Sequence, residues 1–93
     1  MRNNIDDNLS SLSNFDLFRL VLEKFGIEIK DENDIVGAWL VVEKLRLFVM
    51  PWGNDEWCAA THRDERLAFH NIFYAPTAPV AICRTAVMAV ETE

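Results

Sequence analysis

The sequence predicts an α+β domain in which helices cover a small antiparallel sheet. Three segments carry apolar residues at the three- and four-residue steps of amphipathic helices, whereas residues 46–74 are rich in strand-forming residues interrupted by turn residues. The chain has 93 residues, of which 51% are hydrophobic, and a chain of this length forms one core rather than two. We therefore expect residues 1–93 to form a single domain, with residues 1–12 as a flexible segment or a short helix.

The first predicted helix begins after Ser13 and ends at Gly26. Ser13 and Asp16 have the spacing of a capping box, in which the serine hydroxyl accepts a hydrogen bond from an unpaired backbone amide. The apolar face of this helix consists of Phe15, Phe18, Val21, Leu22 and Phe25. Gly26 suits the left-handed conformation that ends many helices. The alternation in residues 27–29 leaves open a fourth strand at the edge of the sheet.

The second predicted helix covers residues 34–45. Acidic and amide side chains in residues 31–34 precede it, where they can accept hydrogen bonds from the first backbone amides and interact with the helix dipole. The expected core stripe is Ile35, Ala38, Trp39, Val42 and Leu45, widened by Val36, Leu40 and Val41. So apolar a helix is expected to be covered on more than one side. Trp39 lies between Ile35 and Val42 on the stripe, and we predict that it is a core residue.

Three strands are predicted over residues 46–50, 56–62 and 67–74. Gly53 and Asn54 suit a two-residue hairpin turn. With that turn, one face of the sheet would carry the pairs Met50 with Trp57 and Phe48 with Ala59, and the other face would carry Leu47, Val49, Cys58 and Ala60.

The third strand places large side chains on both faces. They divide into Leu67, Phe69 and Phe73 on one side and His70, Ile72 and Tyr74 on the other. An uncovered apolar face of a few hundred Å² is unusual on a soluble monomer. We therefore expect a three-layer α/β/α sandwich with the N-terminal helix on one face and the other two helices on the opposite face. A protein partner on one face is the alternative.

The last predicted helix follows Thr77, which is expected to cap it, and Pro79 lies in its first turn, where a missing amide costs little. Its apolar stripe is Val80, Cys83, Val87 and Val90, broadened by Ile82 and Ala86. Small residues at Ala81, Ala86 and Ala89 allow this helix to approach its neighbours closely.

Two segments of the chain resemble a known family. Residues 34–46 (DIVGAWLVVEKLR) and 77–90 (TAPVAICRTAVMAV) are similar to the two signature helices of the phage ABA sandwich domain. The similarity includes Trp39, Pro79 and Cys83 at fixed places, and it covers residues 33–90. Thr85 departs from the pattern, since alanine is frequent there. The resemblance implies a helix–sheet–helix fold and a phage or prophage origin, and it implies no activity.

Charge and hydropathy exclude several classes of function. The net charge is −6, and the nine lysines and arginines are scattered among acidic residues, so we expect no direct binding to nucleic acid. Apolar runs such as residues 37–42 are far shorter than the ~20 residues of a membrane span. The N-terminus lacks the pattern of a signal peptide, and two cysteines do not make a disulfide framework. We expect a cytoplasmic protein, in the host cell if a phage encodes it.

No catalytic, metal-binding or cofactor-binding motif is present. The soft metal ligands are Cys58, His62, His70 and Cys83, and their spacing matches no compact zinc site. The three glycines cannot form a phosphate-binding loop, and no serine lies in a nucleophile elbow. We therefore expect no metal, no cofactor and no enzyme activity. The alternative is a small enzyme or ligand-binding module that uses the turn from His62 to Glu65.

The best candidate for a partner contact is the first hairpin. Trp52 lies beside Gly53 at its tip, where the ring either folds back over the sheet or anchors a partner, and Asp55 and Glu56 add negative charge. The sequence thus favours an accessory protein that acts through protein–protein contacts, for instance as an acidic inhibitor of a host defence or nucleic-acid-binding protein. Both a monomer and a homodimer are compatible with the sequence.

Overall fold

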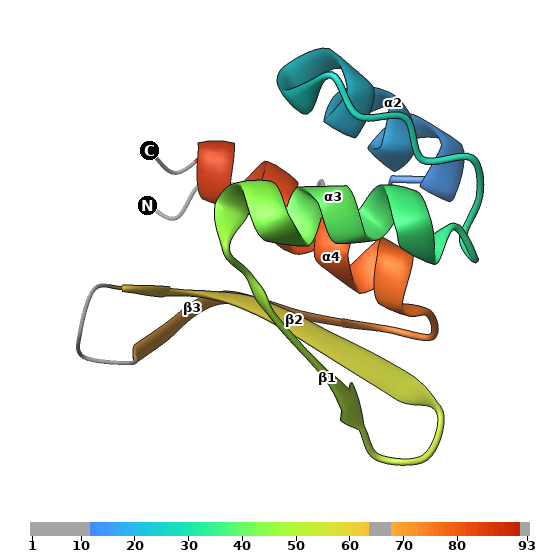
Figure 1. Ribbon diagram of the computed structural model, residues 1–93. Coiled ribbons are helices and arrows are strands. Elements are labelled where there is room, and N and C mark those ends of the chain that lie inside the picture. The colour runs from blue at the N-terminus through green and yellow to red at the C-terminus, as the bar shows by residue number, and fades with distance from the viewer. Residues whose placement is uncertain (1–11, 64–67, 92–93) are drawn as a thin grey trace.

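A computed structural model of the protein describes residues 12–63 and 68–91, with side chains described for residues 12–61 and 72–90. The elements are α2 (Asn14–Phe25), α3 (Ile35–Leu45), β1 (Phe48–Trp52), β2 (Glu56–Arg63), β3 (Ala68–Ala75) and α4 (Ala78–Glu91). The strands form an antiparallel sheet in the order β1-β2-β3 (Figure 1). The predicted α+β class is confirmed. Apart from Leu12, the N-terminal segment expected over residues 1–12 lies outside the described residues.

Helix α4 is at the centre of the fold. It packs against β2 and β3 on one side and against α2 and α3 on the other. Its fully buried side chains are Ala81, Ile82, Cys83, Thr85 and Ala86. Most of them are small, which allows the sheet, α2 and α3 all to approach α4 closely. The Thr85 hydroxyl donates a hydrogen bond of 2.8 Å to the carbonyl oxygen of Ala59 and so fixes α4 over the central strand.

The cap predicted for α4 is formed differently. Thr77 directly precedes the helix, and its carbonyl oxygen accepts a hydrogen bond from the Ala81 amide at 3.2 Å. Its side-chain oxygen is buried and has no hydrogen-bond partner within the described structure, so the hydroxyl does not cap the helix. Pro79 is in the first turn, as predicted.

The position of the N-terminal helix differs from the prediction. Its ends are as expected: the Ser13 side chain accepts a hydrogen bond from the Asp16 amide at 3.1 Å, and Gly26 ends the helix with φ of 71°. However, α2 packs on α4 rather than on the free face of the sheet, so α2, α3 and α4 lie on the same side (Figure 1). The reason is that α4 is apolar around most of its circumference and needs cover on the side away from the sheet.

Helix α3 is buried along a narrower stripe than predicted. The buried residues of α3 are Gly37, Ala38, Val41 and Val42, and the helix packs on α4. Trp39 is 50% exposed, so the prediction that Trp39 is a core residue is wrong. Within the described structure only one side of α3 is covered, and the small size of Gly37 and Ala38 allows that side to approach its neighbours closely. The large side chains of Ile35, Val36, Trp39 and Leu40 are on the exposed side of the helix.

The start of α3 is fixed by Asp34. One carboxylate oxygen accepts a hydrogen bond from the Gly37 amide and the other from the Lys30 amide, both at 2.9 Å. These two hydrogen bonds stabilise the charged carboxylate and lower the pKa of Asp34. The segment before α3, residues 26–30, forms no strand, so the fourth strand left open by the sequence is absent there. Ile29 from this segment is part of the core.

This cap explains why a glycine lies inside α3. A Cβ atom at Gly37 would lie 2.8 Å from the Glu28 carbonyl oxygen and 2.9 Å from an Asp34 carboxylate oxygen. Replacing a helical glycine by alanine normally stabilises a helix by up to ~1 kcal/mol. At Gly37 we expect the opposite sign, because the methyl group would displace the capping carboxylate and the backbone beside it.

The Gly37→Ala variant should therefore unfold at a lower urea concentration than the parent, by the equivalent of about 1 kcal/mol. The control is Val36→Ala at the neighbouring, 73% exposed position, where we expect little change. A Gly37→Ala protein as stable as the parent would show that the segment before α3 moves away without cost.

The first hairpin has a different register from the predicted one. Its loop contains three residues, Gly53 to Asp55, and Gly53 adopts a φ of 66°. Met50 consequently pairs with Cys58, and Phe48 pairs with Ala60. The prediction of Met50 opposite Trp57 and Phe48 opposite Ala59 is wrong by one residue. Because side chains alternate along a strand, this slip moves every side chain of β2 to the other face.

The two faces of the sheet can now be assigned. Val49, Ala59, Phe73 and Ala75 face the helices and belong to, or pack on, the core. We call the opposite side the outer sheet face, and its described residues are Phe48, Met50, Trp52, Glu56, Cys58, Ala60, Ile72 and Tyr74. The pairing of β2 with β3 shifts by one residue between Ala59 and Thr61. The predicted orientations of Leu67, Phe69 and His70 concern side chains outside the described residues.

Candidate functional site

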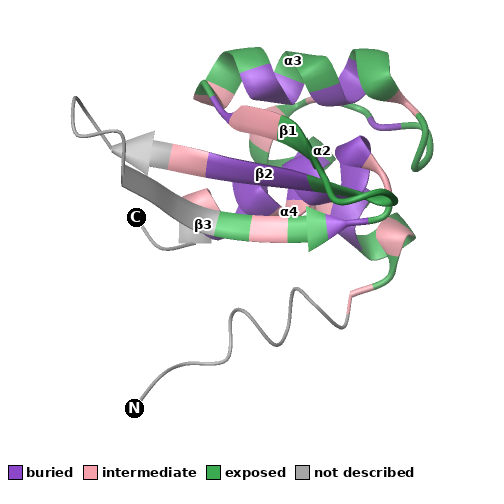
Figure 2. Cartoon of the chain, turned by 90° about the horizontal axis from the view of Figure 1, so that it is seen from below, coloured by how far each residue is buried: buried purple, intermediate pink, exposed green. Residues whose placement is uncertain are grey.

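The outer sheet face is an uncovered surface of the described structure that carries several large apolar side chains. All three described helices lie on the other side of the sheet, so none of them covers this face (Figure 2). Its exposed large side chains are Met50, Trp52, Ile72 and Tyr74, each between 36% and 49% exposed. Most monomeric proteins avoid exposing contiguous apolar patches of this kind, and such patches commonly mark sites of protein–protein contact.

An aromatic pair lies at one end of this face. The rings of Trp52 and Tyr74 come from the two edge strands, and their centroids are 5.5 Å apart at an angle of 52°. Tilted rings at this separation attract each other and are held in place. Trp52 therefore folds back over the sheet, as one of the two alternatives predicted, and about half of its surface nevertheless remains available. Tryptophan and tyrosine held in this way are typical anchors of protein interfaces.

The residues at the centre of the outer sheet face are small and buried. Cys58 and Ala60 on the middle strand are 6% and 3% exposed, because Met50, Phe48 and Tyr74 on the neighbouring strands flank them. This burial raises the pKa of the Cys58 thiol, so the group stays protonated near neutral pH. The face is therefore a shallow surface with a raised aromatic end, a shape suited to a flat protein surface rather than to a small molecule.

The charges beside the aromatic pair are negative. Glu56 pairs with Trp52 and shares the outer sheet face, and Asp55 lies in the adjoining loop. Both side chains are exposed. The structure thus brings together the three residues that the sequence identified, Trp52, Asp55 and Glu56. The sequence did not connect them with Tyr74, because the first strand was predicted to end at Met50 and Trp52 was assigned to the turn, whereas β1 extends to Trp52.

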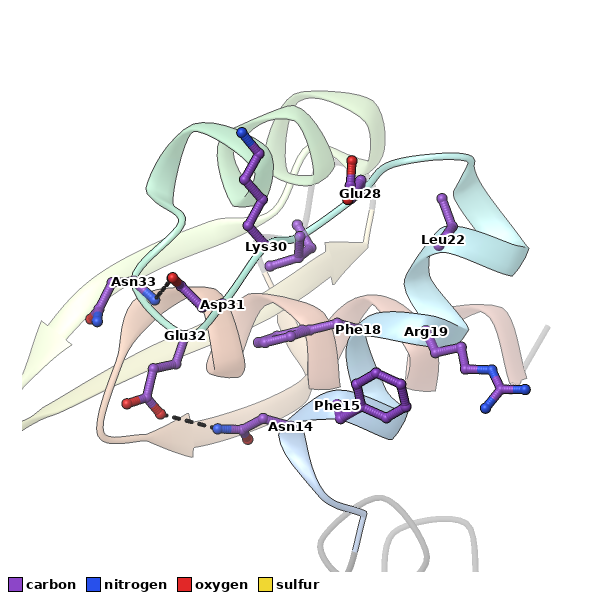
Figure 3. Close-up of a pocket in the computed structure, with 11 residues that line it drawn as sticks. Asn14, Phe15, Phe18, Arg19, Leu22, Glu28, Lys30, Asp31, Glu32 and Asn33 are labelled. Carbon is purple, nitrogen blue, oxygen red and sulfur yellow. Dashed lines mark hydrogen bonds between the residues drawn. The ribbon is translucent and has the colours of Figure 1, made fainter.

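A hollow lies between α2 and the segment that leads to α3 (Figure 3). Its volume is about 660 Å³, and it opens to solvent. The ring of Phe18 lies between the two walls, and a hydrogen bond of 3.1 Å from the Asn14 side-chain amide to the Glu32 carboxylate joins them. The charged groups that line it are of both signs: Arg19, Glu28, Lys30, Asp31 and Glu32. The residues that line this hollow include no buried catalytic group. Their charges do not favour a ligand of one sign.

The candidate metal ligands do not converge where they are described. Cys83 is fully buried in α4, and burial, with a contribution from the negative charge of Asp34, raises the pKa of its thiol to about 12. Cys58 lies on the outer sheet face, and both cysteines are free. Within the described part of the chain, no three histidine, cysteine or acidic residues are placed to hold a metal ion. The side chains of His62 and His70, and the turn from His62 to Glu65, lie outside the described residues.

We expect the purified protein to bind no zinc at a stoichiometric level. The physical reason is that Cys83 would have to lose its proton in an apolar environment that strongly favours the neutral thiol. Elemental analysis of the native protein is the measurement. One zinc ion per chain, with loss of the folded state on chelation, would contradict the prediction.

Comparisons of the chain with protein-family models, with curated proteins and with solved structures find no match. None of the helices in the described part of the chain combines the length and hydropathy needed to cross a bilayer. The resemblance of residues 33–90 to the phage ABA sandwich domain therefore stays a prediction.

Proposed function

We propose that this chain is a small phage or prophage accessory protein that acts in the host cytoplasm by binding a protein with its outer sheet face. The observation that supports the proposal is the exposed apolar sheet with the Trp52–Tyr74 pair at its acidic end. Within the described residues this surface carries no cluster of groups suited to catalysis, so the proposal assigns it recognition rather than a reaction.

The chemistry of the surface supports a particular kind of partner. A complementary protein would present a flat apolar patch bordered by lysine or arginine near the position of Asp55 and Glu56. Proteins that bind nucleic acid carry basic surfaces of this kind. With a net charge of −6, the chain would attract such a protein over a distance and compete with its nucleic acid. This favours an inhibitor of a host defence or nucleic-acid-binding protein.

The test compares two variants that differ only in which surface they change. The parent, Ile72→Asp on the outer sheet face and Leu40→Asp on α3 are each used to capture proteins from host lysate, and the affinity of the captured protein is then measured. Ile72 and Leu40 are 43% and 51% exposed, so both variants should fold. We expect Ile72→Asp to weaken binding by at least about 30-fold, the effect of removing an interface hot spot, and Leu40→Asp to bind like the parent.

A partner that binds the parent and Ile72→Asp equally well would show that the outer sheet face is not the binding surface. The inhibitory role is tested separately by adding the parent to a complex of the captured protein with its nucleic acid. Release of the nucleic acid, reduced at high salt, is expected, because the attraction depends on charge.

A further inference from the structure

The outward side of α3 is a second exposed apolar surface, separate from the outer sheet face. Val36 is 73% exposed, and Ile35, Trp39 and Leu40 are each about half exposed. Their spacing places them in one row along the helix, which we call the α3 stripe. Ala38, Val41 and Val42 face α4, so the stripe points away from the domain, on the exposed side of α3 in Figure 2.

The charges at the two ends of α3 are opposite in sign. Three acidic residues and one lysine lie at the start of the helix, so the net charge there is −2. Two basic residues and one glutamate lie at its end, where the net charge is +1. These residues are Lys30, Asp31, Glu32 and Asp34 at the start and Glu43, Lys44 and Arg46 at the end. A surface with this distribution is complementary to itself when a two-fold axis crosses its middle. Two helices then run antiparallel, and each acidic end lies beside a basic end.

We propose that the chain forms a homodimer in which the α3 stripe of one copy packs on the α3 stripe of a second copy. Burial of the four apolar side chains supplies the attraction, and the opposite side-chain charges at the two ends of the helix fix the orientation. The outer sheet face is not self-complementary in this way, since Asp55 and Glu56 are both negative and lie at the same end. Dimerisation through α3 leaves both outer sheet faces available.

The size of the stripe determines how tight the dimer is. Specific interfaces bury about 1,200–2,000 Å² in total, and α3 has only 11 residues, so this interface falls at the low end of that range. We therefore expect a reversible dimer. Its average mass should rise with concentration from 10.7 kDa toward twice that value.

The experiment is sedimentation equilibrium of the full chain over a concentration range of about 5–500 µM. The parent should show the rise in mass, and Val36→Asp should remain a monomer throughout with an unchanged circular dichroism spectrum. Leu40→Asp is a second variant of the same kind. The control is Ile72→Asp, which adds the same charge to the outer sheet face and should dimerise like the parent.

Charge reversal tests the orientation. Lys44→Glu should weaken the dimer about tenfold, because both copies then bring two acidic ends together. Adding Glu32→Lys to that variant makes the start of the helix neutral, which removes the repulsion and should restore part of the affinity. A parent that stays at 10.7 kDa throughout the range would overturn the proposal. The proposal would also be overturned if Val36→Asp and Leu40→Asp both dimerised like the parent. The same holds if Ile72→Asp were the only variant that failed to dimerise. These results are independent of the capture experiment, in which Leu40→Asp is expected to bind normally.

Discussion

Replacing Ile82 by alanine is expected to lower the free energy of unfolding by about 2–5 kcal/mol, the usual cost of truncating a large buried aliphatic side chain. Ile82 is 0% exposed and lies in α4, which contacts both the sheet and the other two helices. The cavity would therefore lie where several elements meet and could not be filled by movement of one of them. Urea denaturation followed by circular dichroism measures the change.

The matched comparison is Trp39→Ala on α3. Its ring is larger than the Ile82 side chain but 50% exposed, so we expect a loss of less than about half that of Ile82→Ala. This replaces the expectation from the sequence, which placed Trp39 in the core. If Trp39→Ala destabilised the chain more than Ile82→Ala, the described packing of α3 on α4 would be incorrect. In a dimer the comparison is made at a concentration where the chain is monomeric.

Replacing Thr85 by valine should lower the free energy of unfolding by about 1–2 kcal/mol. The two side chains have nearly the same shape, so the packing is kept. The change removes the buried hydrogen bond of 2.8 Å to the Ala59 carbonyl oxygen, the link between α4 and the central strand. Thermal and urea unfolding of the variant measure the effect.

Thr85→Ser is the control, because serine keeps the hydroxyl group and loses only a methyl group. Its hydroxyl can still donate to Ala59, and the loss should be that of a single buried methyl, about 1 kcal/mol or less. A Thr85→Val protein that is as stable as the parent would mean that the hydrogen bond makes no net contribution. The sequence offered no sign of this role beyond a threonine at a position where the predicted family resemblance implies alanine.

The candidate site was only partly predictable from the sequence. Trp52, Asp55 and Glu56 were identified because a tryptophan beside a turn glycine is unusual, and they do lie together at one end of the outer sheet face. Tyr74 was assigned to one side of the third strand with His70 and Ile72 and was not linked to the turn, whereas its ring contacts Trp52. The α3 stripe was missed as a surface, although the signal was present. A helix that is apolar all round requires cover on all sides, and α4 covers only one side of α3.

The sequence by itself determined the local features of this protein. Ser13, Gly26 and Asp34 start or end their helices as predicted, because capping hydrogen bonds join residues within three or four positions of each other. The three strands and the last helix also fall close to their predicted ranges. Each of these features depends on a short stretch of chain whose preferences agree.

Only the tertiary structure decided how these elements are arranged. A loop of three rather than two residues at Gly53 changed which side chains of β2 face the helices, and the local pattern permits both lengths. Whether Trp39 is buried depends on which side of α3 meets α4. Likewise, α2 packs on α4 rather than on the sheet, because α4 is the helix with the most apolar surface to bury. The outer sheet face and the α3 stripe are exposed as a result of these long-range choices.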